Sequence, residues 1–291
     1  FRVRFIMTLL PGQYQIGNFV FGTHTNFKVD TVDIGNYDVN VQDFQIPTSD
    51  ETRFGSDTLK PAPIQLTINA LVNRTLDNVA QLTNDHRVID YSDSTLGQLQ
   101  EEWRAEEIRS QWGVLKPLLY CGEDGITRRF YGRPGKFAYS KRPIKGLYYQ
   151  IQAEYRRSDT LCYSDIEYYI DFAANAPQTV TRSRGDAPNW LRMVITGPAA
   201  HPVINFGTAQ LELDYSVAPG ELVEISSYPW ARRIISSNGQ SLSAYLIADS
   251  PYLSQIRLRH DLPIQIAWTA TGLGGGSKMT LAWHDGYQVM E

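Results

Sequence analysis

The amino-acid sequence predicts a mainly β protein built from two β-sandwich domains, with one α-helix in the first domain. Aromatic residues make up 12% of the 291 residues, and with the many Val, Ile and Thr they are typical of half-buried pleated surfaces. Pro and Gly are spread along the whole chain, as short strands joined by tight turns require. Apolar residues also recur at every second position in many segments, which is the periodicity of a strand with one buried face.

Strand-like segments fill most of the first half of the chain. After a polar loop that ends at Pro63, the residues Ile64, Leu66 and Ile68 alternate with polar ones, so this segment is predicted to be a strand buried on one face. The same reasoning predicts strands in 17–21, 27–34, 37–46, 115–122, 127–140, 146–158 and 165–172.

One segment, residues 94–112, departs from the β pattern and predicts a helix. Ser94 is a candidate N-cap, and strong helix formers follow it. Leu96, Leu99 and Trp103 share one helical face, whereas Ile108 and Trp112 are displaced to another. We therefore expect one helix that packs on a sheet and has both faces partly covered.

The sequence changes character at 173–190, a small, polar, turn-rich stretch of the kind that separates domains. We place the domains at 1–176 and 177–291. Asn238-Gly239 predicts a two-residue type I′ hairpin, because both positions must adopt positive φ, and the glycine-rich 272–278 is expected to be a flexible hairpin loop. Strands are predicted throughout the second domain, in 191–197, 202–207, 209–216, 221–227, 231–239, 241–247, 255–260, 263–271 and 278–286.

Charge and composition exclude several classes of protein. The net charge is −4 and neither half of the chain is basic, which argues against nucleic-acid recognition. No run of 18 apolar residues predicts a membrane span, and the first residues lack the apolar core of a signal peptide. The chain starts at Phe1, so residues upstream are expected to be missing. Cys121 and Cys162 are expected to be free buried thiols of a protein made in a reducing cytoplasm.

No motif in the sequence carries recognisable chemistry. The segment GLGGGSK lacks the Gly before Lys that a phosphate-binding loop needs and lies between two strands. The histidines form no metal-binding pair, and no nucleophile has a catalytic context. We therefore predict no catalytic, cofactor-binding or metal-binding residue, and a protein that is not an enzyme. The five histidines are His24, His86, His201, His260 and His284.

Tryptophans in a β-sandwich raise the alternative of a sugar-stacking platform. Trp268 and Trp283 alternate in phase with Ile266 and Leu281, so we expect both of them in the core. Trp230 follows Pro229 in a turn and is less settled. A carbohydrate-binding module that attaches to a host envelope through the second domain therefore remains the alternative function.

Several stretches taken together resemble a known family. They are FVFGTHTNFKV, RFGSDTLKPAPIQLTI, LYCGEDGITRRFYGRPGKFAY, GDAPNWLRMVITGPAAHPVINF and GELVEISS with the later SNG. In this order they resemble the distal tail protein (Dit), a minor tail protein of long-tailed, non-contractile bacteriophages (siphophages), particularly those of mycobacteria and related actinobacteria. The likeness covers nearly the whole chain, and the last module is its most specific part.

The resemblance implies a structural component of the virion. The first domain would be a tail-tube-like sandwich that forms a hexameric ring, and the second a galectin-like sandwich mounted outside it. The ring would join the tail tube to the tail-tip hub (the baseplate and adhesion apparatus). The expected partners are therefore further copies of the chain, the major tail tube protein and the hub or tail-associated protein. The tape measure protein and the receptor-binding proteins are expected as further partners. The protein would be made in the host cytoplasm and reside at the distal end of the phage tail, without inserting into a membrane. His201 and Asn205 do not match the spacing of the galectin sugar-binding motif, so sugar binding is not implied.

Overall fold

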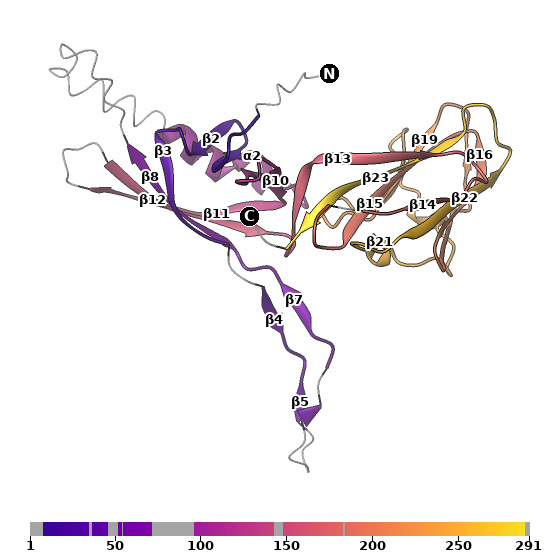
Figure 1. Cartoon of the computed structure of the whole chain (residues 1–291), viewed down its shortest axis with the longest axis horizontal. Helices are drawn as coiled ribbons and strands as arrows, with labels where there is room; N and C mark the ends of the chain where they lie inside the picture. The colour runs from indigo at the N-terminus through magenta and orange to yellow at the C-terminus, as the bar shows by residue number, and fades with distance from the viewer. Residues whose placement is uncertain are drawn as a thin grey trace. The chain divides into compact units, whose positions relative to one another are not determined.

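The computed structural model of the chain confirms a mainly β protein (Figure 1). It describes residues 8–34, 37–45, 52–53, 55–71, 96–142, 148–182 and 184–288. These residues form two compact units, of which the first extends to Cys162 and the second spans Tyr163–Gln288. No helix among the described residues has the length and apolar character that a membrane crossing would need.

Eight strands of the first unit form two antiparallel groups, a four-stranded sheet with the order β11-β12-β8-β3 and a run of four neighbouring strands with the order β2-β1-β9-β10. Four further short strands form two separate two-stranded pairs, β4 with β7 and β5 with β6. The strands are β1 (Gln13–Ile16), β2 (Phe19–Gly22), β3 (Phe27–Asp33), β4 (Asp38–Asn40), β5 (Phe44–Gln45), β6 (Thr52–Arg53), β7 (Thr58–Lys60), β8 (Ile64–Leu71), β9 (Leu118–Cys121), β10 (Thr127–Phe130), β11 (Gly132–Arg142) and β12 (Tyr148–Arg157).

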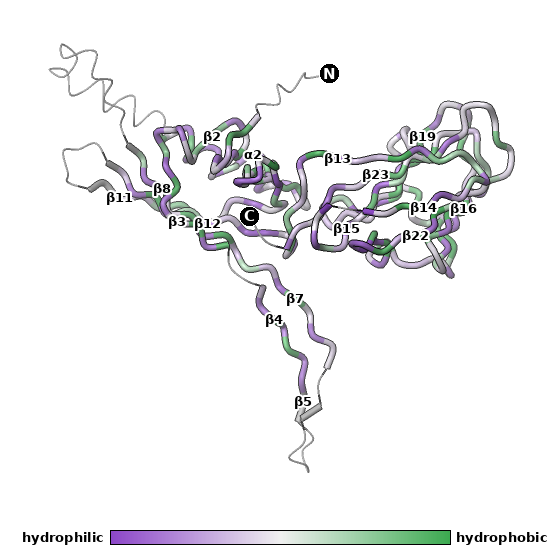
Figure 2. The backbone as a smooth tube through the Cα atoms, in the orientation of Figure 1, coloured by the Kyte–Doolittle hydropathy of each residue, from purple (hydrophilic) through white to green (hydrophobic). Residues whose placement is uncertain are grey.

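Period-two alternation sets the buried face of the sheet that contains β8 and β12. Ile68 lies opposite Ile151 in the antiparallel register, and Leu66 lies opposite Ala153. All four side chains are buried, as the sequence alternation predicted. Figure 2 shows the backbone colour changing between hydrophilic and hydrophobic along such strands.

The predicted single helix over 94–112 is wrong in its extent. Residues 96–104 are helical and this helix ends before Ala105. A second short helix, α2 (Glu106–Arg109), follows. Ala105 is buried and adopts a left-handed conformation with φ of 46°, which an α-helix does not tolerate in its interior. The candidate N-cap Ser94 lies outside the described residues. The break explains why Ile108 and Trp112 are out of phase with the apolar face of residues 96–104.

Trp103 anchors this helical segment in the core of the first unit. Its indole is fully buried, and its Nε1 donates a hydrogen bond to the backbone oxygen of Glu154 at 3.1 Å. The ring contacts Phe21 from one sheet and Phe137 from the other, with centroid distances of 6.4 and 6.1 Å. The helix therefore contributes the side chain that joins the two sheets, as expected for a helix that packs on a sheet.

The second unit is a sandwich of two antiparallel sheets. One contains β13, β23, β15, β19 and β20 in that order, with β21 paired to β15. The other has the order β14-β22-β16-β17, with β18 paired to β16. The strands are β13 (Cys162–Phe172), β14 (Gln178–Val180), β15 (Asn189–Thr196), β16 (Ala199–Phe206), β17 (Ala209–Glu212), β18 (Ser216–Val217), β19 (Leu222–Ser226), β20 (Arg233–Ser236), β21 (Arg257–Leu258), β22 (Ile264–Thr271) and β23 (Lys278–Tyr287).

Apolar side chains from both sheets fill the space between them. Met193 and Leu281 come from one sheet and Ile204 and Trp268 from the other, and all four are fully buried in one cluster. Trp283 belongs to the same cluster. The prediction that Trp268 and Trp283 are core residues is therefore confirmed.

Three local predictions in the second domain are wrong. The glycine-rich loop 272–278 joins β22 to β23, which belong to different sheets, so it crosses the sandwich and is not a hairpin loop. Only Gly239 of the Asn238-Gly239 pair has positive φ, 82°, which excludes a type I′ turn. Instead of strands over 241–247 and 255–260 there are 3₁₀ turns, η2 (Ser243–Tyr245) and η3 (Leu253–Gln255), with β21 reduced to two residues.

The contacts divide the chain earlier than the sequence suggested. The second compact unit begins at Tyr163, whereas the composition changes near 176/177. The difference is the strand β13, whose Phe172 joins the core of the second unit. Composition marks a turn-rich linker but not the strand before it, so the domain limits 1–176 and 177–291 stay a prediction from sequence. Cys121 and Cys162 are both buried and neither forms a disulfide, as expected.

A buried ion pair organises one end of the second unit. The side chains of Arg182 and Asp285 are 1% and 4% exposed, and Arg182 Nε lies 3.3 Å from Asp285 Oδ1. Arg182 also donates hydrogen bonds to the backbone oxygens of Arg184, Ala187 and Leu258 at 2.9, 2.9 and 3.2 Å. Burial lowers the pKa of Arg182, and the charge of Asp285 opposes this shift. One guanidinium thus holds two backbone segments, residues 184–187 and Leu258, and also pairs with the side chain of Asp285.

We expect Arg182→Ala to destabilise the second unit by about 3–5 kcal/mol, because it leaves the carboxylate of Asp285 buried without its partner. Urea denaturation followed by tryptophan fluorescence measures this change. Arg184→Ala is the control, since Arg184 is exposed and its loss should change stability by less than about 0.5 kcal/mol. Equal unfolding midpoints for the two variants would show that the buried pair does not hold this end of the unit together.

Candidate interaction surfaces

The sequence predicted no catalytic, cofactor-binding or metal-binding residue. Within the described ranges, no three His, Cys, Asp or Glu side chains gather in a way that could hold a metal ion. His86 lies outside those ranges. The other histidines lie in separate parts of the chain, at His24, His201, His260 and His284. The exposed apolar and aromatic side chains of the described residues are the candidate interaction surfaces.

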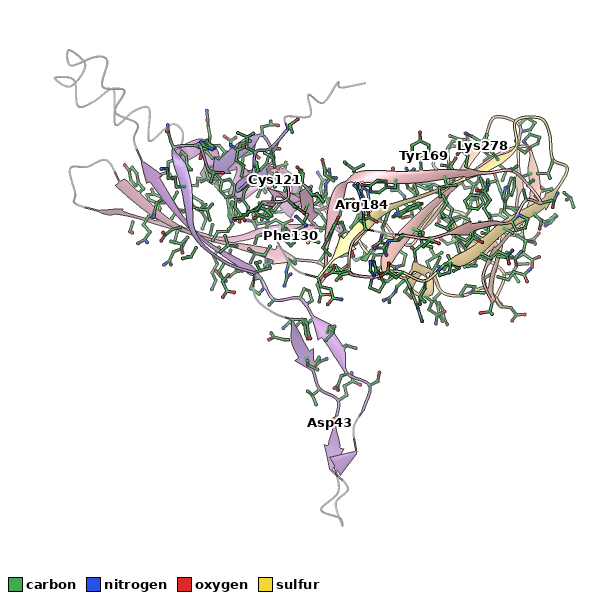
Figure 3. All side chains as sticks on the ribbon, viewed as in Figure 1. Asp43, Cys121, Phe130, Tyr169, Arg184 and Lys278 are labelled. Carbon is green, nitrogen blue, oxygen red and sulfur yellow. The ribbon has the colours of Figure 1, made fainter. Side chains whose placement is uncertain are left out.

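A two-stranded ribbon between β3 and β8 is the first such surface. β4 and β7 pair only with each other among the described strands, and they lie side by side in Figure 1. All of their residues are exposed. We call residues 37–45 with 52–53 and 55–60 the arm; it continues through the second pair, β5 with β6, and Asp43 is labelled on it in Figure 3.

The arm has one apolar and one polar face. Val39 lies opposite Leu59, and Tyr37 and Val41 share their side of the ribbon because strand side chains alternate. These four side chains are 47–55% exposed. On the other face Asp38 lies opposite Lys60 and Asn40 opposite Thr58.

A ribbon of two strands is at best marginally stable in water, and an uncovered apolar strand face invites association. The four apolar side chains of the arm are exposed in the single chain, and no other described strand pairs with its edges. The arm therefore has the chemistry of a segment that docks on a partner.

Trp112 is the second exposed feature of the first unit. Its side chain is 100% exposed, although the sequence pattern assigned it to a partly covered helical face. The chain around it is held in place by Arg133, whose Nε donates to the backbone oxygen of Val114 and whose Nη2 donates to that of Gln111, both at 2.6 Å. A fixed loop that presents a whole indole to solvent matches the aromatic anchors of protein interfaces.

Trp230, the residue on which the sugar-binding alternative depended, is not a free platform. Its ring stacks on Tyr228 with centroids 4.7 Å apart and planes 10° apart. Tyr163 meets it edge-on at the same centroid distance. A sugar needs an open aromatic face on which to stack, so nothing in this geometry favours the carbohydrate-binding alternative.

Comparisons with known proteins give a likeness of fold. No protein-family model matches the chain, and no curated protein matches its sequence. Among solved structures, the chain is similar to the Dit protein of phage SPP1, described as a paradigm of the hub adsorption apparatus in phages that infect Gram-positive bacteria. The two are 15% identical with a TM-score of 0.60, and the match covers 94% of this chain and 98% of that one.

A chain in the activated, calcium-bound baseplate of phage P2 is a more distant match. It is 8% identical with a TM-score of 0.47, over 93% of this chain and 97% of that one. The first comparison shows that the chain shares its fold with a phage hub protein over nearly the full length of both.

The sequence missed both exposed surfaces of the first unit. It predicted a strand over 37–46 and a loop over 51–63 but gave no sign that they pair with each other. The alternation of Tyr37, Val39 and Val41 was a usable signal of a one-sided apolar ribbon. For Trp112 the helical periodicity gave a wrong prediction, because the helix is interrupted at Ala105 and the residues beyond it no longer follow the same helical face.

We expect Trp112→Ser to leave the stability of the isolated chain within about 0.5 kcal/mol of the wild type, because a fully exposed side chain contributes little to folding. Trp103→Ser is the matched comparison, and its loss from the core should cost at least about 3 kcal/mol. Urea unfolding midpoints measure both changes. A large loss for Trp112→Ser would mean that the indole packs within its own chain.

Proposed function

We propose that this chain is a structural subunit of a phage tail tip, a distal tail protein whose copies form a ring between the tail tube and the tail-tip hub. The observation that carries the proposal is the likeness of fold to the Dit protein of phage SPP1, which spans nearly the full length of both chains. The sequence motifs resemble the same family in the same order. The proposal assigns the chain no enzymatic chemistry.

The arm supplies a physical reason for the chain to assemble with itself. A ring requires a heterologous interface, in which one patch of each subunit binds a different patch of the next. The apolar face of the arm, with Val39 and Leu59 at its centre, is suited to be one of these patches. Trp112, exposed on a fixed loop, is the candidate for the complementary patch.

The remaining assignments follow from the same family. The first domain would be the tail-tube-like, ring-forming part and the second a galectin-like domain outside the ring. Six copies would close the ring. The tube protein and the hub would be the direct neighbours, and the virion of a phage of mycobacteria or related bacteria the location.

We expect the purified chain to form a discrete closed oligomer at high concentration, and Val39→Asp/Leu59→Asp to reduce it to monomers, because two buried carboxylates would oppose docking of the arm. Sedimentation velocity and negative-stain imaging measure the oligomer. Tyr169→Asp, which places a charge at an exposed apolar site of the second unit, should assemble as the wild type does. Monomers at every concentration, together with absence of the protein from purified virions, would contradict the proposal.

Trp112→Ser is expected to weaken the same oligomer by about 2–4 kcal/mol per interface, as loss of an aromatic anchor does. Concentration-dependent sedimentation measures the change. Because Trp112 is fully exposed in the single chain, a loss of assembly would not reflect misfolding. Unchanged assembly would exclude Trp112 from the ring interface while leaving the arm as the contact.

A further inference from the structure

Two arginines of the second unit lie over one tryptophan. Trp190 in β15 lies opposite Arg257 in β21, whose guanidinium carbon is 4.1 Å from the centre of the indole. The guanidinium carbon of Arg232 is 5.3 Å from the same ring. Trp190 is only 7% exposed, and its Nε1 donates to the hydroxyl of Tyr163 at 3.0 Å. The sheet and this hydrogen bond therefore fix the platform on which both cations lie.

These arginines have no counter-charge of their own. Residues 163–288 contain eight basic and eleven acidic residues, and the ion pairs among the described residues include four of the basic ones, Arg182, Arg192, Arg233 and Lys278. Within the described ranges no ion pair involves Arg232 or Arg257, nor Arg259, which follows Arg257 on the same side of the chain. All three are exposed.

Positive charges at this spacing repel one another. Both guanidiniums lie near one ring, so they are separated by no more than about 10 Å, one Debye length at 0.1 M salt. The indole offsets part of this repulsion through cation–π attraction. A bound anion that contacts both arginines would offset far more of this repulsion, because opposite charges attract strongly at short distance.

The geometry also prepares Arg257 for a carboxylate. Its Nε and Nη2 donate to the backbone oxygen of Ser254 at 3.3 and 3.2 Å, which fixes the plane of the guanidinium. The remaining N–H groups of the fork are directed elsewhere, and a planar fork suits the two oxygens of a carboxylate. Less side-chain entropy is lost on binding when the donor is already held in place.

We propose that Arg232, Arg257 and Arg259 around Trp190 form a docking site for an acidic segment of a protein partner, with Asp or Glu side chains as the bound groups. Trp, Tyr and Arg are the residue types enriched at the energetic centres of protein interfaces, and Tyr252, in the turn before Arg257, is 76% exposed. An acidic polysaccharide is disfavoured because sugar rings need open aromatic faces, whereas the arginines cover Trp190. This proposal is independent of ring formation.

The test uses the full chain and a synthetic peptide of six glutamates at low ionic strength, with binding measured by calorimetry. We expect binding to the wild type and at least about tenfold weaker binding to Arg232→Ala/Arg257→Ala, since each interface arginine contributes more than about 1 kcal/mol. Arg104→Ala/Arg184→Ala removes the same charge from exposed arginines elsewhere and should bind as the wild type does.

Arg232→Lys/Arg257→Lys is the control for misfolding, because it keeps both positive charges on long side chains. It should bind with intermediate affinity, since lysine lacks the fork. Equal weakening in the two alanine double variants would reveal non-specific attraction and overturn the site. Binding of dextran sulfate but not of the glutamate peptide would show that the site recognises an acidic polysaccharide and would overturn the proposal of an acidic protein segment. Binding of neither probe would show that the arginines form no anion-binding site.

Discussion

The need to cover the apolar face of every sheet governs both units of this protein. An antiparallel sheet with one apolar face is stable only when that face is buried against another element. In the first unit Trp103 meets this need, because its indole lies between side chains of the two sheets and its Nε1 is satisfied by the backbone of β12. In the second unit the two sheets cover each other, with Trp268 hydrogen-bonded to the backbone oxygen of Phe172. The indoles of Trp103 and Trp268 are thus both buried together with a partner for their single polar atom, which avoids the cost of an unpaired donor.

The ends of a sandwich expose loop backbone groups that need hydrogen-bond partners when they are buried. In the second unit polar side chains supply these partners. The backbone oxygens of Arg184 and Ala187 accept from the guanidinium of Arg182, which supplies several donors from one side chain. Asp285 balances its charge, and Asn189 links the same carboxylate to the backbone of Gly286. The Arg184-Gly185-Asp186 tripeptide lies in the loop 181–188, where Arg182 donates to the backbone oxygen of Arg184 and the backbone N–H of Asp186 donates to that of Gly286.

Alternation and composition predicted most of the fold because they report burial, which is a local property of each strand. Ile64, Leu66 and Ile68 were assigned to the correct face, and Trp268 and Trp283 to the core, from spacing alone. Pairing is not local. The loop 272–278 was taken for a hairpin because two alternating segments flank it, yet those segments belong to opposite sheets. The left-handed Ala105 was equally invisible, because alanine is the best helix former and only its tertiary surroundings hold it outside the helical region. The arginines over Trp190 could not be found from sequence, since Arg232 and Arg257 meet only when β21 pairs with β15.

Two features of the chain remain uncompensated within the described residues, and they differ in physical kind. The arm exposes apolar side chains on one face of a two-stranded ribbon, so its association would be driven by burial of surface and depend little on salt. The arginines over Trp190 carry charge without a carboxylate, so their association would weaken as ionic strength rises. A protein that assembles with itself and also recognises a different partner benefits from this separation, because a contact of one kind does not compete for the surface of the other. The same fold can then hold a permanent contact and a salt-sensitive one at once, each with its own chemistry.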